Sequence, residues 1–203
     1  MSEEFPPQAE HIREVESLVE VFASVVEGRS ALYASSPLTT GQRAFDWHRR
    51  SGSLSGIALT KRDADAFRRE VLEPNRVQAA RFAQDLRQRT GRLVIDPTAV
   101  EDLPAWTQAD YHVLWGRVIE RYADVVVFRD GWQHSSGCAY EFFAACTSGS
   151  QLFREDLTPL AREEGRVLLA DAVDENRARG ISGEFLQRVL KALSEPAASD
   201  SER

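Results

Sequence analysis

The run A-D-V-V-V-F-R at residues 123–129 constrains the fold of this chain more than any other segment. It is rich in β-branched residues and apolar on both faces, a pattern typical of a parallel strand at the centre of a sheet. Parallel strands are joined by crossover connections of a dozen or more residues, usually helices. The rest of the chain should therefore contain further strands that alternate with helices.

Shorter apolar segments mark the other strands. Residues 30–36 and 92–96 are short runs that end at prolines, and residues 151–153 are a candidate fourth strand. Apolar residues at helical spacing occupy the segments between and around these runs. The spacing predicts helices over 9–27, 63–89, 106–122, 137–147, 160–179 and 182–193.

Two segments depart from this simple pattern. Pro74 lies inside the predicted helix 63–89, so this segment is either a long helix with a kink or a broken pair of helices. Residues 38–60 contain three glycines and several serines and threonines, and we expect a long loop with little regular structure there.

The alternation of strands and helices predicts an α/β fold, a parallel-sheet three-layer sandwich of the flavodoxin/Rossmann-like kind. An extra N-terminal helix and the C-terminal helices add to this sandwich. We expect residues 1–29 to pack on a single domain formed by residues 30–195, and residues 196–203 to form a disordered tail.

Composition narrows the class of protein. The hydrophobic fraction of 42% is too high for an intrinsically disordered chain. The apolar runs fall well short of the roughly 18 residues that a membrane span requires. Cys138 and Cys146 form neither a disulfide framework nor a zinc-binding pattern, and the acidic N-terminus does not resemble a signal peptide. We expect a soluble, cytoplasmic protein with no membrane partner, no metal and no cofactor.

The net charge of −7 is unevenly distributed. Residues 1–30 carry seven acids and two bases, whereas residues 43–92 carry twelve bases and six acids. The basic segment is either a solvated helix face or an attraction for a small anion such as a nucleotide phosphate. The net acidity disfavours a long nucleic acid as the partner.

Three loops should meet at one ligand site, because open parallel sheets bind ligands at the carboxyl ends of their strands. These loops are residues 36–43, 97–110 and 130–141. In the third loop, Ser135, Ser136 and the amides around Gly137 can donate hydrogen bonds at a helix start. Glu141 lies about one turn into that helix, where its carboxylate either faces the crevice or simply complements the helix dipole.

Residues 123–141 resemble the signature of the nucleoside 2-deoxyribosyltransferase-like superfamily, which includes nucleotide N-glycosidases. The shared pattern is an apolar strand that begins with Ala123 and Asp124, a loop with glycine, and Gly137 followed four residues later by Glu141. The segment Y-A-S-S-P-L-T-T-G at 33–41, which includes Pro37, is similar to the opening motif of that superfamily. The resemblance covers roughly residues 30–153 and is closest to a bacterial and phage branch.

The resemblance implies that Glu141 is a nucleophile, which attacks the anomeric carbon of a sugar and displaces the base. Water or a second base then takes the glycosyl group, as in a retaining glycosidase. Two positions depart from the superfamily pattern, because Gly116 and Ser135 stand where members carry aspartates. Asp110 could supply the missing acid if its helix is shifted, and Asp96 and Asp130 are weaker substitutes.

Other polar and aromatic residues complete the predicted site. Tyr33 and Trp132 could stack on a base or sugar, or could pack in the core. The hydroxyls, amides and guanidinium of one loop could cradle a 5′-phosphate, or could form an ordinary turn. The residues of this predicted phosphate loop are Ser36, Thr39, Thr40, Gly41 and Arg43. His134 is more typical of an exposed loop residue than of an acid, and Cys138 has no partner pattern for a nucleophile.

The sequence supports three hypotheses about function. The first is a nucleoside or nucleotide N-glycosidase or deoxyribosyltransferase-like enzyme. The second is a catalytically silent nucleotide-binding or sensor module of the same fold, and the third is an NAD-cleaving effector. In each case the partner is a small nucleoside or nucleotide. A homodimer or homotetramer would cover the apolar stripe of the helix at 9–27.

Overall fold

The computed structural model describes residues 5–28, 30–52, 60–100 and 103–195. The predicted tail at 196–203 lies outside these residues. The regular elements follow one another along the chain with the bounds that follow. They are α1 (Ile12–Val26), β1 (Ala31–Ser35), α2 (Gln42–Ser51), α3 (Lys61–Phe67), a π-helical segment (Arg68–Leu72), α4 (Glu73–Thr90), β2 (Val94–Ile95), a 3-10 turn (Pro97–Ala99), α5 (Gln108–Tyr122), β3 (Ala123–Phe128), a second 3-10 turn (Trp132–His134), α6 (Ser136–Ser148), β4 (Gln151–Arg154), α7 (Arg162–Ala178) and α8 (Glu184–Ser194).

The four strands form one parallel sheet in the order β2-β1-β3-β4. The predicted strand at 123–129 is β3, and it lies inside the sheet between β1 and β4. All of β1 and most of β3 are buried. The predicted α/β fold with a parallel sheet is therefore confirmed, and most predicted helices begin and end within a few residues of the observed ones.

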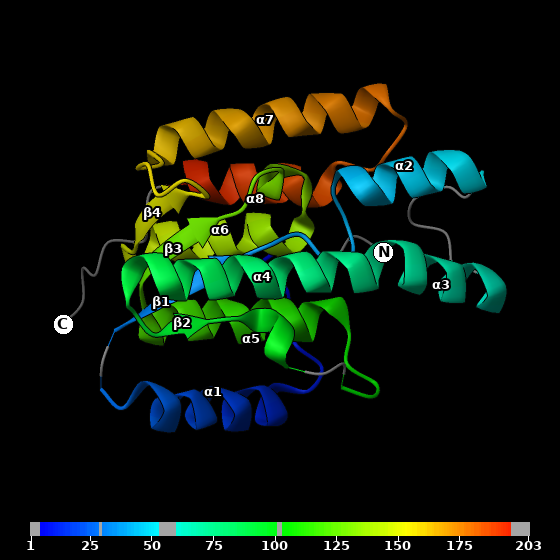
Figure 1. The fold of residues 1–203 in the computed structure, drawn as a ribbon. Helices are drawn as coiled ribbons and strands as arrows, with labels where there is room; N and C mark the ends of the chain where they lie inside the picture. The colour runs from blue at the N-terminus through cyan, green and yellow to red at the C-terminus, as the bar shows by residue number, and fades with distance from the viewer. Residues whose placement is uncertain (1–4, 29, 53–59, 101–102, 196–203) are drawn as a thin grey trace.

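Helices cover both faces of the sheet, which gives three layers (Figure 1). Leu32 and Ala34 of β1 pack with α4 residues on one face, whereas Tyr33 belongs to the larger core formed with α5 and α6. The alternation follows from the period of two in a strand, which sends successive side chains to opposite faces. α1 packs against α5 on the outside, and α8 packs against both α6 and α7.

The expected long loop at 38–60 is wrong over Gln42–Ser51, because these residues form α2. Ala44 and Trp47 lie three positions apart and are buried together with Val71 of the π-helical segment. The contact that stabilises α2 therefore comes from a segment more than twenty residues later in the chain. Local composition carries no information about such a partner, and residues 53–59 of the expected loop lie outside the described residues.

Pro74 does not interrupt the helical path between Lys61 and Thr90. The backbone stays in the right-handed helical region on both sides of the π-helical segment Arg68–Leu72, which ends just before the proline. Proline lacks an N–H and its ring crowds the preceding turn, and a wider π turn relieves both constraints. The predicted break is therefore a local change of hydrogen bonding within a continuous helical path.

Among the described helices, none has the length and apolar character that a membrane crossing would need.

The α6/α7 contact depends on the absence of a side chain at Gly165. A β-carbon built at this position would overlap the ring of Phe142, which is fully buried. We expect Gly165→Ala to lower the free energy of unfolding by about 1–3 kcal/mol, because overpacking costs more than alanine gains in helix propensity. Urea denaturation would measure the change.

Gly183→Ala is the matched control, since its β-carbon would meet Val173 at an ordinary distance of 3.6 Å. That variant should change stability by less than about 1 kcal/mol. Equal losses in the two variants would show that the contact with Phe142 is not the cause.

Candidate active site

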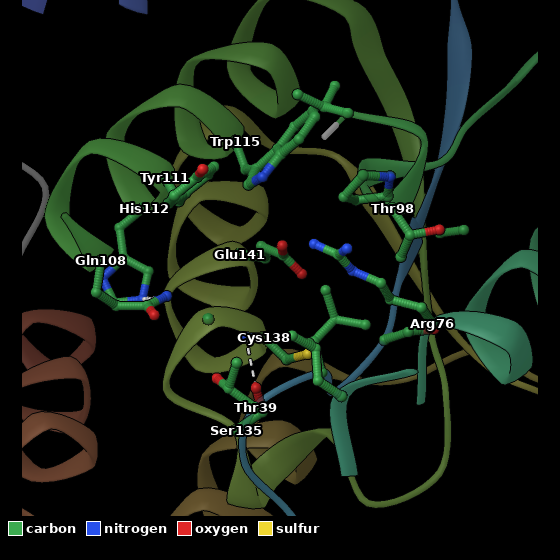
Figure 2. Close-up of a pocket in the computed structure, with 17 residues that line it drawn as sticks. Thr39, Arg76, Thr98, Gln108, Tyr111, His112, Trp115, Ser135, Cys138 and Glu141 are labelled. Carbon is green, nitrogen blue, oxygen red and sulfur yellow. Dashed lines mark hydrogen bonds between the residues drawn. The ribbon is translucent and has the colours of Figure 1, made fainter. Parts of the chain in front are cut away.

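A cavity of about 190 Å³ opens at the carboxyl ends of β1, β2 and β3 (Figure 2). All three predicted loops contribute to its wall, together with residues of α4, α5 and α6. The lining consists of Ala34, Ser36, Leu38, Thr39, Leu72, Arg76, Pro97, Thr98, Val100, Gln108, Tyr111, His112, Trp115, Ser135, Gly137, Cys138 and Glu141. Its composition is mainly apolar with a few polar groups, as is usual for small-molecule sites.

Glu141 of α6 presents its carboxylate to this cavity although only 7% of the residue is exposed. The Tyr33 hydroxyl donates to Oε1 at 2.7 Å, and the Ser35 hydroxyl donates to Oε2 at 2.5 Å. Both donors belong to β1, whose residues pack beneath the first turns of α6. Each carboxylate oxygen therefore has one neutral donor and keeps lone pairs that face the cavity.

Burial raises the pKa of Glu141, and the hydrogen bonds from Ser35 and Tyr33 offset part of this rise. Burial likewise raises the pKa of Tyr33 well above its ordinary value, and the nearby charge of Glu141 raises it further. Tyr33 is therefore a proton donor to Glu141 at neutral pH. An ionisable carboxylate held by two donors in a cavity has the properties of a positioned nucleophile.

Tyr33 is positioned differently from the expected platform for a base or sugar. The residue has no exposed surface, and its ring packs against Trp115 with a centroid separation of 6.2 Å. Only its contact with Glu141 connects it to the cavity. The aromatic groups that line the cavity are Trp115 and Tyr111 of α5 (Figure 2).

Trp132 lies in the hydrophobic core and does not line the cavity. Its ring is 4.8 Å from the rings of both Phe128 and Phe142, and only 3% of the residue is exposed. Ser136 is the first residue of α6 and also does not line the cavity, whereas Ser135 and Gly137 do. Ser135 caps α6 by accepting a hydrogen bond from the Cys138 amide at 3.4 Å.

The predicted phosphate loop is divided between two cavities. Ser36 and Thr39 line the cavity that contains Glu141. Pro37, Gly41 and Arg43 line a second cavity on the other side of the same segment. A single small phosphate in the first cavity would therefore contact only part of the predicted loop.

Asp110 does not line either cavity and instead caps the start of α5. Its Oδ2 accepts hydrogen bonds from the amide and hydroxyl of Thr107 at 2.8 and 2.7 Å, and Oδ1 accepts from the His11 amide at 2.8 Å. Burial opposes its ionisation, but these hydrogen bonds outweigh burial and lower the pKa of Asp110. A carboxylate with a lowered pKa and saturated acceptors joins α1 to α5 and is a poor proton donor.

The two positions where the superfamily carries aspartates have physical reasons for their residues. A β-carbon at Gly116 would lie 2.8 Å from the ring of Tyr140, so this position is the close contact between α5 and α6. A carboxylate there would need the two helices to separate. Among the weaker substitutes, Asp96 caps the 3-10 turn after β2, and Asp130 lines the second cavity.

His134 and Cys138 lack the surroundings that catalysis would require. The side chain of His134 is 12% exposed and packs against Phe45, and burial lowers its pKa although Glu175 lies 3.8 Å away. Burial raises the pKa of the Cys138 thiol above its ordinary value, so the cavity holds a thiol and not a thiolate.

Sequence reasoning missed the residues of α4 and α5 that complete the cavity. Arg76 of α4 directs its guanidinium into the cavity towards Glu141 (Figure 2). The cavity face of α5 was detectable, because Gln108, Tyr111, His112 and Trp115 recur at the i, i+3, i+4, i+7 spacing of one helix face. This face combines polar and aromatic residues, which is unusual for a face that only packs in a core.

Comparison with known proteins identifies no relative: no protein-family model matches the chain, and neither a curated protein nor a solved structure is significantly similar to it. The resemblance to the nucleoside 2-deoxyribosyltransferase-like superfamily therefore stays a prediction from the motifs. Within the described residues, no group of three or more His, Cys, Asp or Glu side chains is arranged to hold a metal ion.

His112 predicts a loss of stability in acid. Burial lowers its pKa to about 4, from 6.5, because the ring packs between Tyr140 and Phe185. The unfolded state therefore binds a proton more tightly, and the stabilisation present above pH 6.5 is lost as the pH falls to 4. We expect the wild type to lose as much as about 3 kcal/mol more than His112→Phe between pH 7 and pH 4. Urea denaturation at both pH values measures this difference, and parallel losses would contradict the assignment.

Asp110 predicts a purely structural effect of substitution. We expect Asp110→Ala to lower the free energy of unfolding by about 2–4 kcal/mol, because it removes a capping box and leaves a buried donor of His11 without its partner. Ligand affinity per folded molecule should stay unchanged. A variant with normal stability and impaired ligand binding would instead place Asp110 in the site.

Proposed function

We propose that this protein is an N-glycosidase or deoxyribosyltransferase-like enzyme that cleaves the bond between base and sugar in a nucleoside or nucleotide. The observation that carries the proposal is the buried carboxylate of Glu141, held at the cavity wall by the hydroxyls of Tyr33 and Ser35. The motif resemblance assigns the nucleophile to the same residue, and the position at the carboxyl ends of parallel strands fits a ligand site.

In the proposed reaction, one oxygen of Glu141 forms a bond with the anomeric carbon of the sugar. The bond from that carbon to the base nitrogen breaks, and its electron pair leaves with the base, which takes a proton from solvent or from a donor in the cavity. Water then attacks the same carbon and releases the sugar, which regenerates the carboxylate. If a second base attacks instead, the outcome is transfer.

The other residues of the cavity have separate roles in this proposal. Trp115 and Tyr111 provide flat apolar surfaces against which a base can pack. Tyr33 and Ser35 are positioning residues that fix the orientation of the carboxylate. Arg76 would bind an anionic group of the substrate or stabilise negative charge on the departing base, since a guanidinium is a strong hydrogen-bond donor to anions.

One observation favours the second candidate, a nucleotide-binding module without catalysis. Among the described residues that line the cavity, Glu141 is the sole carboxylic acid, and residues 101–102 lie outside the described part. A retaining mechanism benefits from a second acid about 5 Å from the nucleophile to protonate the leaving group. Binding without turnover is the expected behaviour if no other group in the cavity performs this role.

The deciding experiment is a base-release assay on a panel of nucleosides, nucleotides and NAD, followed by chromatography. We expect free base from at least one ligand, and a loss of at least about 100-fold in rate for Glu141→Gln. Because only the ionised form attacks, the wild-type rate should fall as the pH drops through the raised pKa of Glu141, above 4.5. The inclusion of NAD tests the third hypothesis with the same readout.

Glu120→Gln is the matched control, since it makes the same acid-to-amide change on an exposed residue outside the cavity. That variant should release base at the wild-type rate. Release that is unchanged in Glu141→Gln would overturn the proposed nucleophile. Thermal stabilisation by a nucleotide that is never consumed would favour the binding module.

A further inference from the structure

A second cavity lies on the opposite side of the segment 36–41 from Glu141. It encloses about 380 Å³ and is lined from α2, α4 and the ends of β1 and β3. The lining residues are Pro37, Thr40, Gly41, Gln42, Arg43, Asp46, Arg50, Asn75, Gln78, Arg129, Asp130 and Gly131. Residues 36, 38 and 39 face the first cavity and residues 37, 40 and 41 face the second, so the segment is a shared wall.

The lining of this second cavity has an excess of positive charge. Three arginines face two aspartates, and one of these, Asp46, already accepts hydrogen bonds from Arg49 at 3.0 Å and Gln42 at 3.2 Å. Arg49 itself does not line the cavity, so part of the charge of Asp46 is neutralised from outside.

The three arginines differ in how far other groups neutralise them. Arg50 lies 4.0 Å from Glu70 in an exposed pair, and such pairs contribute little. Arg129 donates to the Gln78 side chain at 3.0 Å and lies 3.9 Å from Glu155. For Arg43, no ion pair with a carboxylate occurs within the described residues.

Two further donors are directed to the same place. The Thr40 hydroxyl oxygen lines this cavity and is buried without a hydrogen-bond partner among the described residues. α2 begins at the cavity wall after Gly41, and no side chain caps its first amides. Buried donors without partners carry a free-energy cost that a bound acceptor would remove.

We propose that this second cavity is an anion site that binds a phosphate group through Arg43, Arg50 and the Thr40 hydroxyl. Guanidinium groups bind phosphate oxygens with charge-assisted, bidentate hydrogen bonds, and helix N-termini add to the attraction. The inference goes beyond the proposed function, because it concerns binding in a cavity that does not contain Glu141.

The phosphate group could belong to either of two ligands. A nucleotide whose base and sugar occupy the first cavity could extend a distal phosphate past the shared wall. Alternatively, free inorganic phosphate could bind while the first cavity is separately occupied. The chemistry of recognition is the same, so the experiment distinguishes the two sources.

The test uses isothermal titration and thermal unfolding of the full chain carrying Glu141→Gln, which prevents turnover of the ligands. The probes are adenosine, AMP, ADP and inorganic phosphate, followed by the same series for any base identified by the release assay. A joined phosphate predicts that the diphosphate binds about tenfold tighter than the monophosphate, equivalent to one added interaction of 1.4 kcal/mol. A separate phosphate predicts that inorganic phosphate raises the melting temperature even at saturating AMP.

Adding Arg43→Gln or Arg50→Gln should abolish whichever effect is observed and leave monophosphate affinity unchanged. Arg81→Gln on the exposed face of α4 is the control and should preserve the effect. The proposal is overturned if neither effect occurs, or if the effect persists in both cavity variants. Because none of these readouts requires base release, a failure of the proposed enzymatic function would leave this result interpretable.

Discussion

The hydrogen bonds from β1 to the carboxylate of Glu141 are the interaction on which the rest of the candidate site depends. They connect the first strand of the sheet to the first turns of α6, more than a hundred residues later. A buried carboxylate without partners would cost several kcal/mol, and the two hydroxyls reduce that cost without neutralising the charge. The result is a group that stays ionisable and keeps a fixed direction.

Close packing around this carboxylate explains which groups are near it. α5 and α6 approach each other at Gly116, where even a β-carbon would crowd Tyr140. This contact brings Trp115 and His112 to the cavity wall and leaves no room for a second acid at that position. Asp110, the nearest acid in sequence, is used to cap α5 and to fix α1. Catalysis would therefore depend on one carboxylate and on the neutral donors and the arginine of the cavity.

The positive charge of residues 43–92 is distributed by the fold over several surfaces. Arg76 reaches the first cavity, and Arg43 and Arg50 reach the second, although all three belong to one basic stretch of sequence. Other arginines of this stretch form exposed pairs with acids close in sequence, such as Arg89 with Asp85. Both readings of the basic segment thus apply, each to different residues.

By itself, the sequence determined the alternation of strands and helices, the parallel sheet and the three loops at its carboxyl edge. These features follow from local periodicity, because a buried strand such as 123–128 must be apolar on both faces. Only the tertiary structure decided the rest. α2 forms because Trp47 packs on Val71, Trp132 and Tyr33 are buried, and Arg76 enters the cavity. Each of these depends on contacts between segments distant in sequence, and the direction of a side chain across such contacts is not encoded in local spacing.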